Sequence, residues 1–215
     1  MQIACLHTSH INIEVFNDTL RDLGLKDVAL RHSVRPDILA AVERAGGALT
    51  QQITTDTLAA LHALTGQADA VLLACSTLAP LVSEAQKNIH VPVMRPDEAL
   101  AEEAFRQGGK IVVLYTLAAT QVSTDALFSK IAKKYRAKFD LRFIPGAWDL
   151  FKAGDSEAYH ARVAAFADAA YGEGATVVAL AQATMAPAAK LCRKGHPLTS
   201  PAAGLRAVLS AVKRG

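Results

Sequence analysis

The segment Val71-Leu-Leu-Ala-Cys-Ser-Thr-Leu-Ala-Pro80 occurs a second time as Val178-Ala-Leu-Ala-Gln-Ala-Thr-Met-Ala-Pro187. The two copies align without gaps at an offset of 107 residues, and six of their ten positions are identical. A weaker match sets residues 3–8 (IACLHT) beside residues 111–116 (IVVLYT) at an offset of 108. Two matches at nearly one spacing indicate a chain built from two similar halves.

Short aliphatic runs alternate with longer segments of helical period along the chain, which is typical of an α/β protein with buried parallel strands. The aliphatic runs predict strands at residues 3–6, 28–30, 70–74, 91–94, 110–115, 141–144 and 176–181. The helical segments include residues 35–45, 55–64, 96–107, 120–134, 156–171 and 201–212. We therefore predict an α/β fold of two pseudo-symmetric halves, each a doubly wound parallel sheet.

The position of the repeat also predicts the domain boundaries. The first half is expected at residues 1–97 and is joined by a C-terminal helix at residues 201–215, whereas the second half is expected at residues 98–200. Doubly wound sheets bind ligands outside the carboxyl ends of their strands. We therefore expect the loops that follow Leu6, Ala74, Leu114 and Ala181 to line a ligand cleft between the halves.

Composition and charge narrow the class of protein. Of 215 residues, 51% are hydrophobic and 20% are charged, which suits a soluble protein with a sizeable core. The net charge is only +3 and the basic residues are scattered, so we expect neither a nucleic acid nor a membrane as partner. The N-terminal residues do not read as a signal peptide, and no apolar stretch is long enough to span a bilayer.

The three cysteines, Cys5, Cys75 and Cys192, form no CxxC motif and no recognisable cluster with histidines. An odd number of cysteines without a secretion signal indicates free thiols in a reducing compartment. We therefore expect a cytoplasmic protein without a metal site.

Cys75 is the candidate reactive residue. It follows a buried strand at the start of the next helix, where backbone N–H groups and the helix dipole stabilise an anion. Such a position can lower the pKa of a thiol, while Ser76 and Thr77 help to bind a substrate carboxylate. The alternative is a small buried cysteine beside an N-capping hydroxyl, and the matching loop of the second half favours the functional interpretation.

The chain resembles the aspartate/glutamate/hydantoin racemase superfamily. The resemblance lies in residues 74–80 (ACSTLAP), 111–120 (IVVLYTLAAT) and 180–186 (LAQATMA), with further similarity at residues 91–99 and 146–148. It implies a cofactor-independent enzyme that acts on a small carboxylic acid, either an amino acid or a dicarboxylate. It also implies a pair of cysteines, one per half, on opposite faces of the substrate. One takes the α-proton as a thiolate and the other returns a proton as a thiol.

The chain departs from that pattern at the second cysteine, because the repeat places Gln182 opposite Cys75. A carboxamide has no useful basicity, but it can donate hydrogen bonds to a carboxylate or an enolate oxygen. His7, at the end of the first strand, is our candidate for the missing acid–base group, since imidazole titrates near neutrality. The alternative for His7 is an ordinary hydrogen-bonded loop histidine.

The other expected site residues are small or hydroxylic and follow the same strands. The resemblance assigns carboxylate binding to Thr8 and Ser9 in the first half and to Thr116 and Thr120 in the second, and the repeat adds Ala183 and Thr184 after Gln182. For the hydroxyl groups, helix capping is the alternative role.

These residues predict a racemase-like isomerase that needs no cofactor and uses a small carboxylate. Two reactions need only one cysteine: decarboxylation followed by stereospecific protonation, and thiolate addition to a double bond followed by isomerisation. The rival interpretation is a small-carboxylate binding protein without catalysis. The resemblance also allows a homodimer.

Overall fold

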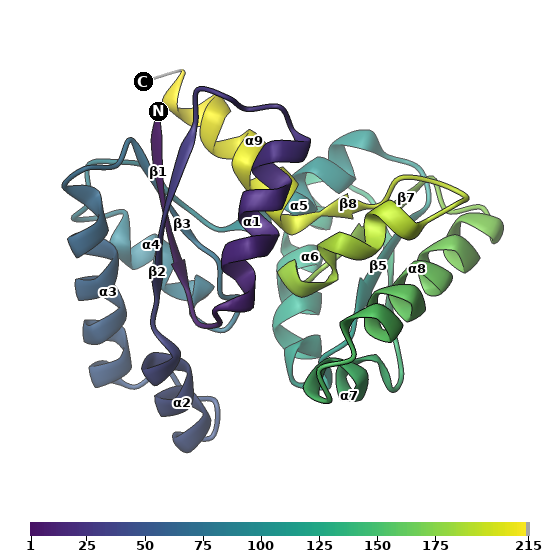
Figure 1. Ribbon diagram of the computed structural model, residues 1–215, viewed down its shortest axis with the longest axis horizontal. Coiled ribbons are helices and arrows are strands. Elements are labelled where there is room, and N and C mark those ends of the chain that lie inside the picture. Colours follow the sequence, from purple (N-terminus) through teal and green to yellow (C-terminus); the bar gives the residue numbers. More distant parts are fainter. Residues whose placement is uncertain (214–215) are drawn as a thin grey trace. The chain divides into compact units, whose positions relative to one another are not determined.

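The computed structural model describes residues 1–213 of the chain as two compact units. Unit 1 comprises Met1–Pro96 together with the described part of Gly204–Gly215, and unit 2 comprises Asp97–Ala203. Each unit is an α/β layer structure with its own parallel sheet (Figure 1). Within the described part of the chain, none of the helices combines the length and apolar character needed to cross a membrane.

Unit 1 holds a parallel sheet in the strand order β2-β1-β3-β4. Its strands are β1 (Gln2–His7), β2 (Ala29–Val34), β3 (Ala70–Leu73) and β4 (Val93–Met94). Its helices are α1 (Ile11–Asp22), α2 (Pro36–Arg44), α3 (Gln51–Thr65), the 3₁₀ helix η1 (Ala79–Leu81) and α4 (Val82–Ala85), and most of α9 (Ser200–Val212) also belongs to it. Alternate β1 residues face opposite sides of the sheet, so Ala4 and Leu6 pack with α2 and α3, whereas His7 contacts Phe16 of α1.

Unit 2 repeats this arrangement with the strand order β6-β5-β7-β8. Its strands are β5 (Ile111–Tyr115), β6 (Phe139–Phe143), β7 (Val177–Leu180) and β8 (Leu198–Thr199). Its helices are most of α5 (Pro96–Gln107), then α6 (Gln121–Tyr135), α7 (Ala147–Lys152) and α8 (Ser156–Gly172), with the 3₁₀ helices η2 (Ala118–Thr120) and η3 (Ala183–Leu191). Both faces of this sheet are covered, since Val113 belongs to a core cluster with Phe128 of α6 and Val112 to one with Tyr159 of α8.

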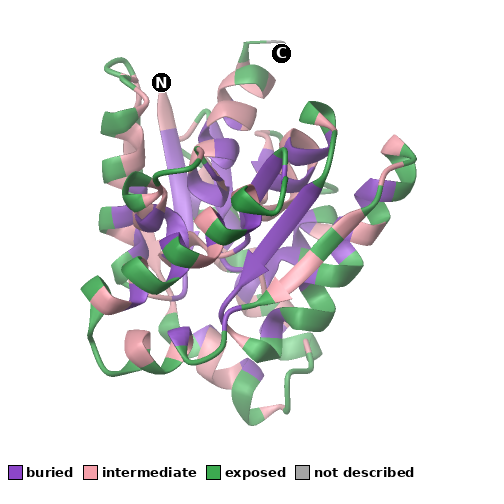
Figure 2. Ribbon diagram, turned by 90° about the vertical axis from the view of Figure 1, so that its right-hand side faces the viewer, coloured by how far each residue is buried: buried purple, intermediate pink, exposed green. Residues whose placement is uncertain are grey.

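The strand register also repeats between the units. Ile3 of β1 pairs with Ala70 of β3, and Ile111 of β5 pairs with Val177 of β7. The predicted α/β fold of two similar parallel-sheet halves is therefore confirmed. Figure 2 shows buried central strands and a strand of intermediate and exposed residues, as expected for the edge strand β6.

The local sequence explains where several elements begin. Pro36 and Pro96 occupy the first positions of α2 and α5, where a missing N–H costs no helical hydrogen bond. Gly109 ends the turn before β5 with a positive φ of 81°, and a Cβ at this position would lie 2.5 Å from Thr176 Oγ1. Only glycine fits such a close approach without movement of Thr176.

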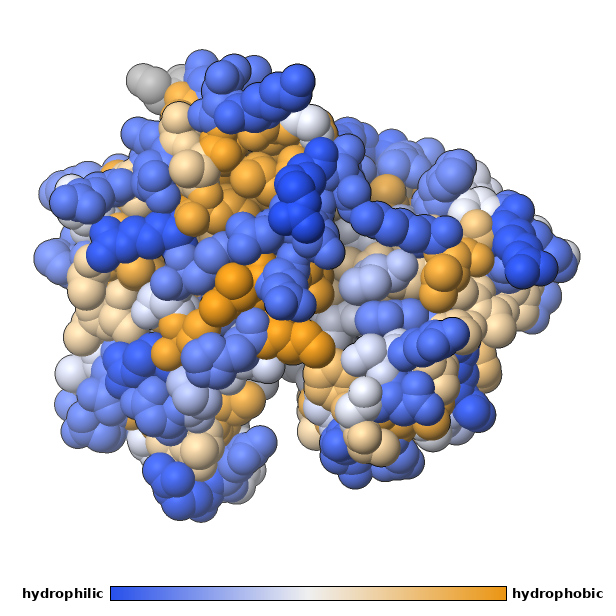
Figure 3. Space-filling model, viewed as in Figure 1, coloured by the Kyte–Doolittle hydropathy of each residue, from blue (hydrophilic) through white to orange (hydrophobic). Residues whose placement is uncertain are grey.

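Hydrophilic side chains cover most of the face shown in Figure 3, with smaller apolar patches between them. Among the described residues, the large hydrophobic side chains classed as exposed are Ile11, Val122, Phe143 and Leu191. Scattered exposed apolar side chains of this kind are normal for a folded protein.

Candidate active site

Cys75 follows the carboxyl end of β3, a central strand of the sheet in unit 1. The N–H of Ala74 donates to the carbonyl of Leu6 at 2.9 Å and extends the parallel ladder by one bond. The chain then turns, because the N–H groups of Leu78 and Ala79 donate to the carbonyl of Cys75 at 3.2 and 2.9 Å. Cys75 is 8% exposed and packs against the core of unit 1. The Cys75 thiol therefore lies at the end of a buried strand, as expected. The expected start of a helix at Cys75 is wrong, because a turn and the short 3₁₀ helix η1 (Ala79–Leu81) come next.

The carboxyl end of β7 has the same local geometry in unit 2. The N–H of Ala181 donates to the carbonyl of Leu114 at 3.0 Å, and the N–H of Met185 donates to the carbonyl of Gln182 at 3.0 Å. Gln182 thus occupies in unit 2 the position that Cys75 occupies in unit 1.

A hydrogen-bond network fixes the side chain of Gln182. Its Oε1 accepts from the backbone N–H and from the hydroxyl of Thr116, both at 2.8 Å. Because a backbone N–H can only donate, the atom that it meets must be the amide oxygen. The half-buried Gln182 therefore keeps its two amide hydrogens for other acceptors.

Buried and half-buried residues extend this network away from Gln182. The Tyr159 hydroxyl lies 3.3 Å from Thr116 Oγ1 and 3.0 Å from Thr184 Oγ1, and burial raises the pKa of Tyr159. Nε2 of the half-buried His160 lies 3.1 Å from the carbonyl oxygen of Thr184 and donates to it. The network thus brings together three expected site residues: Thr116, Gln182 and Thr184.

The remaining expected site residues follow strands and have simpler surroundings. Thr8 is buried, and the carbonyl of Ser9 accepts from Asn12 N at the start of α1. Ser76 and Thr77 follow Cys75 and are half-buried. Two residues of unit 2 complete the set. The hydroxyl of Thr120 donates to the carbonyl of Leu117 at 2.7 Å, a local turn bond, and Ala183 begins η3.

His7 is buried inside unit 1, whereas the sequence predicts that it lines a cleft. Its side chain is fully buried, its Nε2 lies 2.9 Å from Nδ1 of His32, and its ring packs edge-on against Phe16 at 5.2 Å. Burial first, and then the neighbouring charge of His32, lower the pKa of His7 to about 3. These features disfavour an imidazolium at neutral pH, and the acid–base role of His7 stays a prediction.

The other two cysteines have thiols that resist ionisation. Burial raises the pKa of Cys5 to about 12, and burial with the charge of Asp168 raises that of Cys192 to about 11. Cys192 directly follows η3. The sequence shows no cluster of cysteines with histidines, but β-strand pairing brings Cys5 close to His7 and His32.

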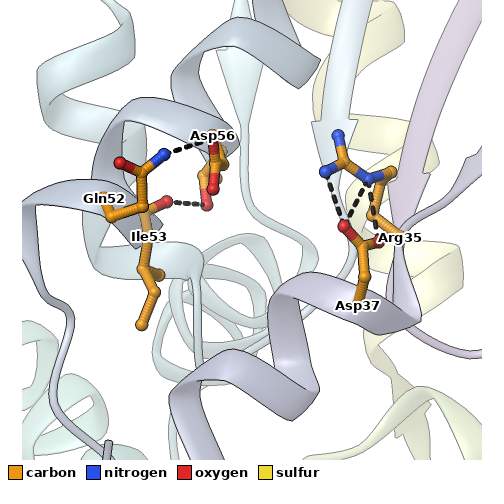
Figure 4. A network of polar contacts seen from close by, with 6 residues as sticks. Arg35, Asp37, Gln52, Ile53 and Asp56 are labelled. Atoms are coloured by element: carbon orange, nitrogen blue, oxygen red, sulfur yellow. Dashed lines mark hydrogen bonds and ion pairs between the residues drawn. The ribbon is translucent and has the colours of Figure 1, made fainter.

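Arg35 is a charged strand-end residue that the sequence reasoning missed. Its N–H donates to the carbonyl of His7 at 2.8 Å, which extends the sheet beyond the end of β2. Its guanidinium holds Asp37 through Nε and Nη2 at 2.9 and 2.7 Å (Figure 4). The predicted strand ends at Leu30, so the sequence places Arg35 at the start of a helix. A charged residue directly before Pro36 is the signal that could have marked the strand end.

Comparisons with known proteins agree with this architecture. The chain matches the profile of the family described as Asp/Glu/Hydantoin racemase over residues 8–207. A search of curated proteins gives no match.

Several solved structures share the fold. One is the aspartate racemase of Picrophilus torridus, at 13% identity and a TM-score of 0.75, with 99% of this chain and 94% of that chain covered. The allantoin racemase of Pseudomonas fluorescens is 20% identical with a TM-score of 0.68, and the coverage is 100% and 92%. Glutamate racemase RacE1 of Bacillus anthracis is 15% identical with a TM-score of 0.66, and the coverage is 99% and 81%. Because the family profile spans most of the sequence, the chain belongs to the Asp/Glu/hydantoin racemase family.

Proposed function

We propose that the protein is a cofactor-independent enzyme of the isomerase type that moves a proton at the α-carbon of a small carboxylic acid. The observation that carries this proposal is the matched pair of strand ends, with a thiol at Cys75 and an oriented amide at Gln182. Family membership and the racemase names of the similar structures support it.

In the proposed reaction, Cys75 acts as a thiolate and takes the α-proton of the substrate. The C–H bond breaks, an S–H bond forms, and the electron pair moves onto the carboxylate as an enolate. Donor groups that face developing negative charge lower the barrier to this step. We assign that role to the free amide hydrogens of Gln182. Carboxylate binding is assigned to the hydroxyl-bearing residues Thr8, Ser9, Ser76, Thr77, Thr116, Thr120 and Thr184, together with Ala183.

A one-cysteine decarboxylation is the second candidate reaction. It is favoured because the position matched to Cys75 holds the amide of Gln182 instead of a second thiol. An amide at the matched position cannot return a proton as a thiol does. In this reaction the bond between the α-carbon and a second carboxylate breaks and releases CO₂. The electron pair forms the same enolate, and the Cys75 thiol then protonates the α-carbon. Addition of the thiolate to a substrate double bond, followed by isomerisation, also needs only Cys75.

The test is a panel of substrates incubated with the protein in heavy water. The panel holds both enantiomers of aspartate and glutamate, hydantoins and allantoin, a malonate-type diacid and an unsaturated cis-diacid. Nuclear magnetic resonance follows deuterium at the α-carbon, loss of CO₂ and double-bond geometry, so that each reaction class has its own readout. Calorimetry on the same panel measures binding.

Cys75→Ser is the decisive variant, and Cys192→Ser is the matched thiol control. A positioned acid–base group contributes roughly 10²- to 10⁴-fold to the rate, so Cys75→Ser is expected to lose about that much while Cys192→Ser keeps the wild-type rate. Equal activity in both variants contradicts the proposal. Binding without any turnover would instead support the non-catalytic carboxylate binder.

Gln182→Cys tests the role of the second half directly. If proton transfer needs two thiols, this change is expected to raise the rate of α-proton exchange at least about tenfold, because a second acid–base group becomes available. An unchanged rate, in a variant that folds as the wild type does, supports the one-cysteine reactions. Alongside this mechanism, a cytoplasmic location and a homodimer stay predictions, to be checked by cell fractionation and light scattering.

A further inference from the structure

Three side chains able to bind a metal ion converge in unit 1 on the sheet face that α1 covers. Cys5 of β1 pairs in register with His32 of β2, and His7 lies two residues beyond Cys5 on the same face. One ligand atom from each residue lies within 4.8 Å of the other two. Cys5 and His7 are fully buried, whereas His32 is half-buried on the edge strand.

The hydrogen bonds of His32 set its tautomer for metal binding. Nε2 of His32 lies 3.1 Å from the side-chain oxygen of Asn17 on α1, so Nε2 carries the hydrogen and Nδ1 presents a lone pair. A histidine that binds a metal usually donates its other ring N–H to an oxygen in this manner. The Asn17 oxygen thus acts as the outer-shell partner that orients the ligand.

The His7 ring contributes the second nitrogen. Its Nε2 lies 2.9 Å from the lone pair on Nδ1 of His32, which requires a proton or a cation between them. Its Nδ1 has no hydrogen-bond partner among residues 1–213. The His7 proton can therefore move to Nδ1 when an ion takes its place, and the imidazole stays neutral.

We propose that Cys5, His7 and His32 bind one zinc ion. One thiolate and two imidazoles suit Zn²⁺, whereas Mg²⁺ and Ca²⁺ require oxygen ligands. Zinc bonds of about 2.0–2.3 Å place tetrahedral ligand atoms roughly 3.3–3.6 Å apart. Side-chain rotations that move these ligand atoms by about 1 Å bring them to that spacing. The Cys5 S–H bond breaks on binding and its proton passes to solvent. Three protein ligands leave the fourth position to water.

This site is independent of the proposed racemase chemistry, which uses Cys75. From the sequence, His7 is also a candidate acid–base group, and a His7 ring bound to zinc cannot serve as one. His32 is the most exposed of the three ligands, since it is half-buried and the other two are buried. Variants of His32 and Cys5 therefore test the zinc site without touching the proposed catalytic thiol.

The experiment titrates the full chain with Zn²⁺ in competition with a chromophoric chelator, and separately replaces zinc by Co²⁺. We expect one ion per chain and, with cobalt, a thiolate-to-metal charge-transfer band. His32→Ala and Cys5→Ala should each weaken binding at least about tenfold and remove or shift that band. Asn17→Ala, which keeps all three ligands, should weaken binding about 10- to 100-fold, as outer-shell changes do.

Two matched controls should bind zinc as the wild type does: Cys75→Ala, which removes a different buried thiol, and His160→Ala, which removes a half-buried histidine of unit 2. Circular dichroism verifies that each variant folds. If Cys5→Ala does not fold, the wild-type cobalt band and its loss in His32→Ala decide the question. Absence of zinc binding, binding that survives both ligand variants, or a cobalt complex without a thiolate band would overturn the proposal.

Discussion

Removal of the Gln182 side-chain oxygen is expected to destabilise unit 2 more than removal of the Thr116 hydroxyl. Gln182 Oε1 accepts two hydrogen bonds of 2.8 Å from Thr116, which is fully buried. In Gln182→Leu, the Thr116 hydroxyl can turn towards Tyr159, 3.3 Å away, but the backbone N–H cannot turn. An unpaired buried N–H costs about 1–3 kcal/mol and a lost hydroxyl bond adds about 1 kcal/mol. Because water reaches the half-buried site, we expect a loss of about 2 kcal/mol in the free energy of unfolding.

Thr116→Val is the comparison, since it removes the hydroxyl but keeps the backbone N–H bond to Gln182. Its expected cost is about 1 kcal/mol. Urea unfolding followed by tryptophan fluorescence measures both variants within the affected unit. Trp148 is the only tryptophan, it stacks on Phe151 at 4.7 Å, and the Phe151 ring lies 5.3 Å from that of Tyr159. A Gln182→Leu variant as stable as Thr116→Val would refute the argument that the backbone donor needs this acceptor.

Two further perturbations test packing and charge in unit 1. Gly204→Ala is expected to destabilise the protein by about 1–3 kcal/mol in thermal unfolding, because the added Cβ would lie 2.9 Å from the Cβ of Pro96. Gly66→Ala, with nothing within 4 Å, is the control and should have little effect. The hydrogen bond from Arg35 lowers the pKa of Asp37 below its ordinary value of 3.8, so the stability it contributes is present above that value and is lost as pH falls through the lowered pKa. Arg35→Gln should raise the pKa of Asp37 in a nuclear magnetic resonance titration, and an unchanged pKa would contradict this pairing.

The repeat could be predicted from the sequence because each copy is a short run of neighbouring residues. A buried strand and the turn of small residues that follows it are neighbours in the chain, so the matching segments at residues 71–80 and 178–187 reveal most of the repeat. The positions of Cys75 and Gln182 at the strand ends follow from the same pattern. The orientation of the Gln182 amide does not, because it depends on Thr116 from the adjacent strand end.

The extent of β2 shows where local patterns fail. Residues 31–33 (RHS) carry polar side chains, so the sequence pattern ends the predicted strand at Leu30, whereas β2 continues to Val34. An edge strand packs against a neighbour on one side only and tolerates such residues. For this reason the sequence predicts neither Arg35 at a strand end nor the pairing of His32 with Cys5. The approach of Cys5 to His32 depends on parallel pairing between segments about 25 residues apart, which spacing along the chain does not reveal.

The discontinuity of unit 1 has a consequence for synthesis on the ribosome. Unit 2 is a single continuous stretch, Asp97–Ala203, and every segment that it needs has been made once Ala203 is added. Unit 1 is completed later, because its last segment belongs to the helix that begins with Ser200. That segment is translated after the whole of unit 2. The half whose synthesis begins first is thus the half that is completed last, since its closing segment follows the whole of unit 2 in the chain.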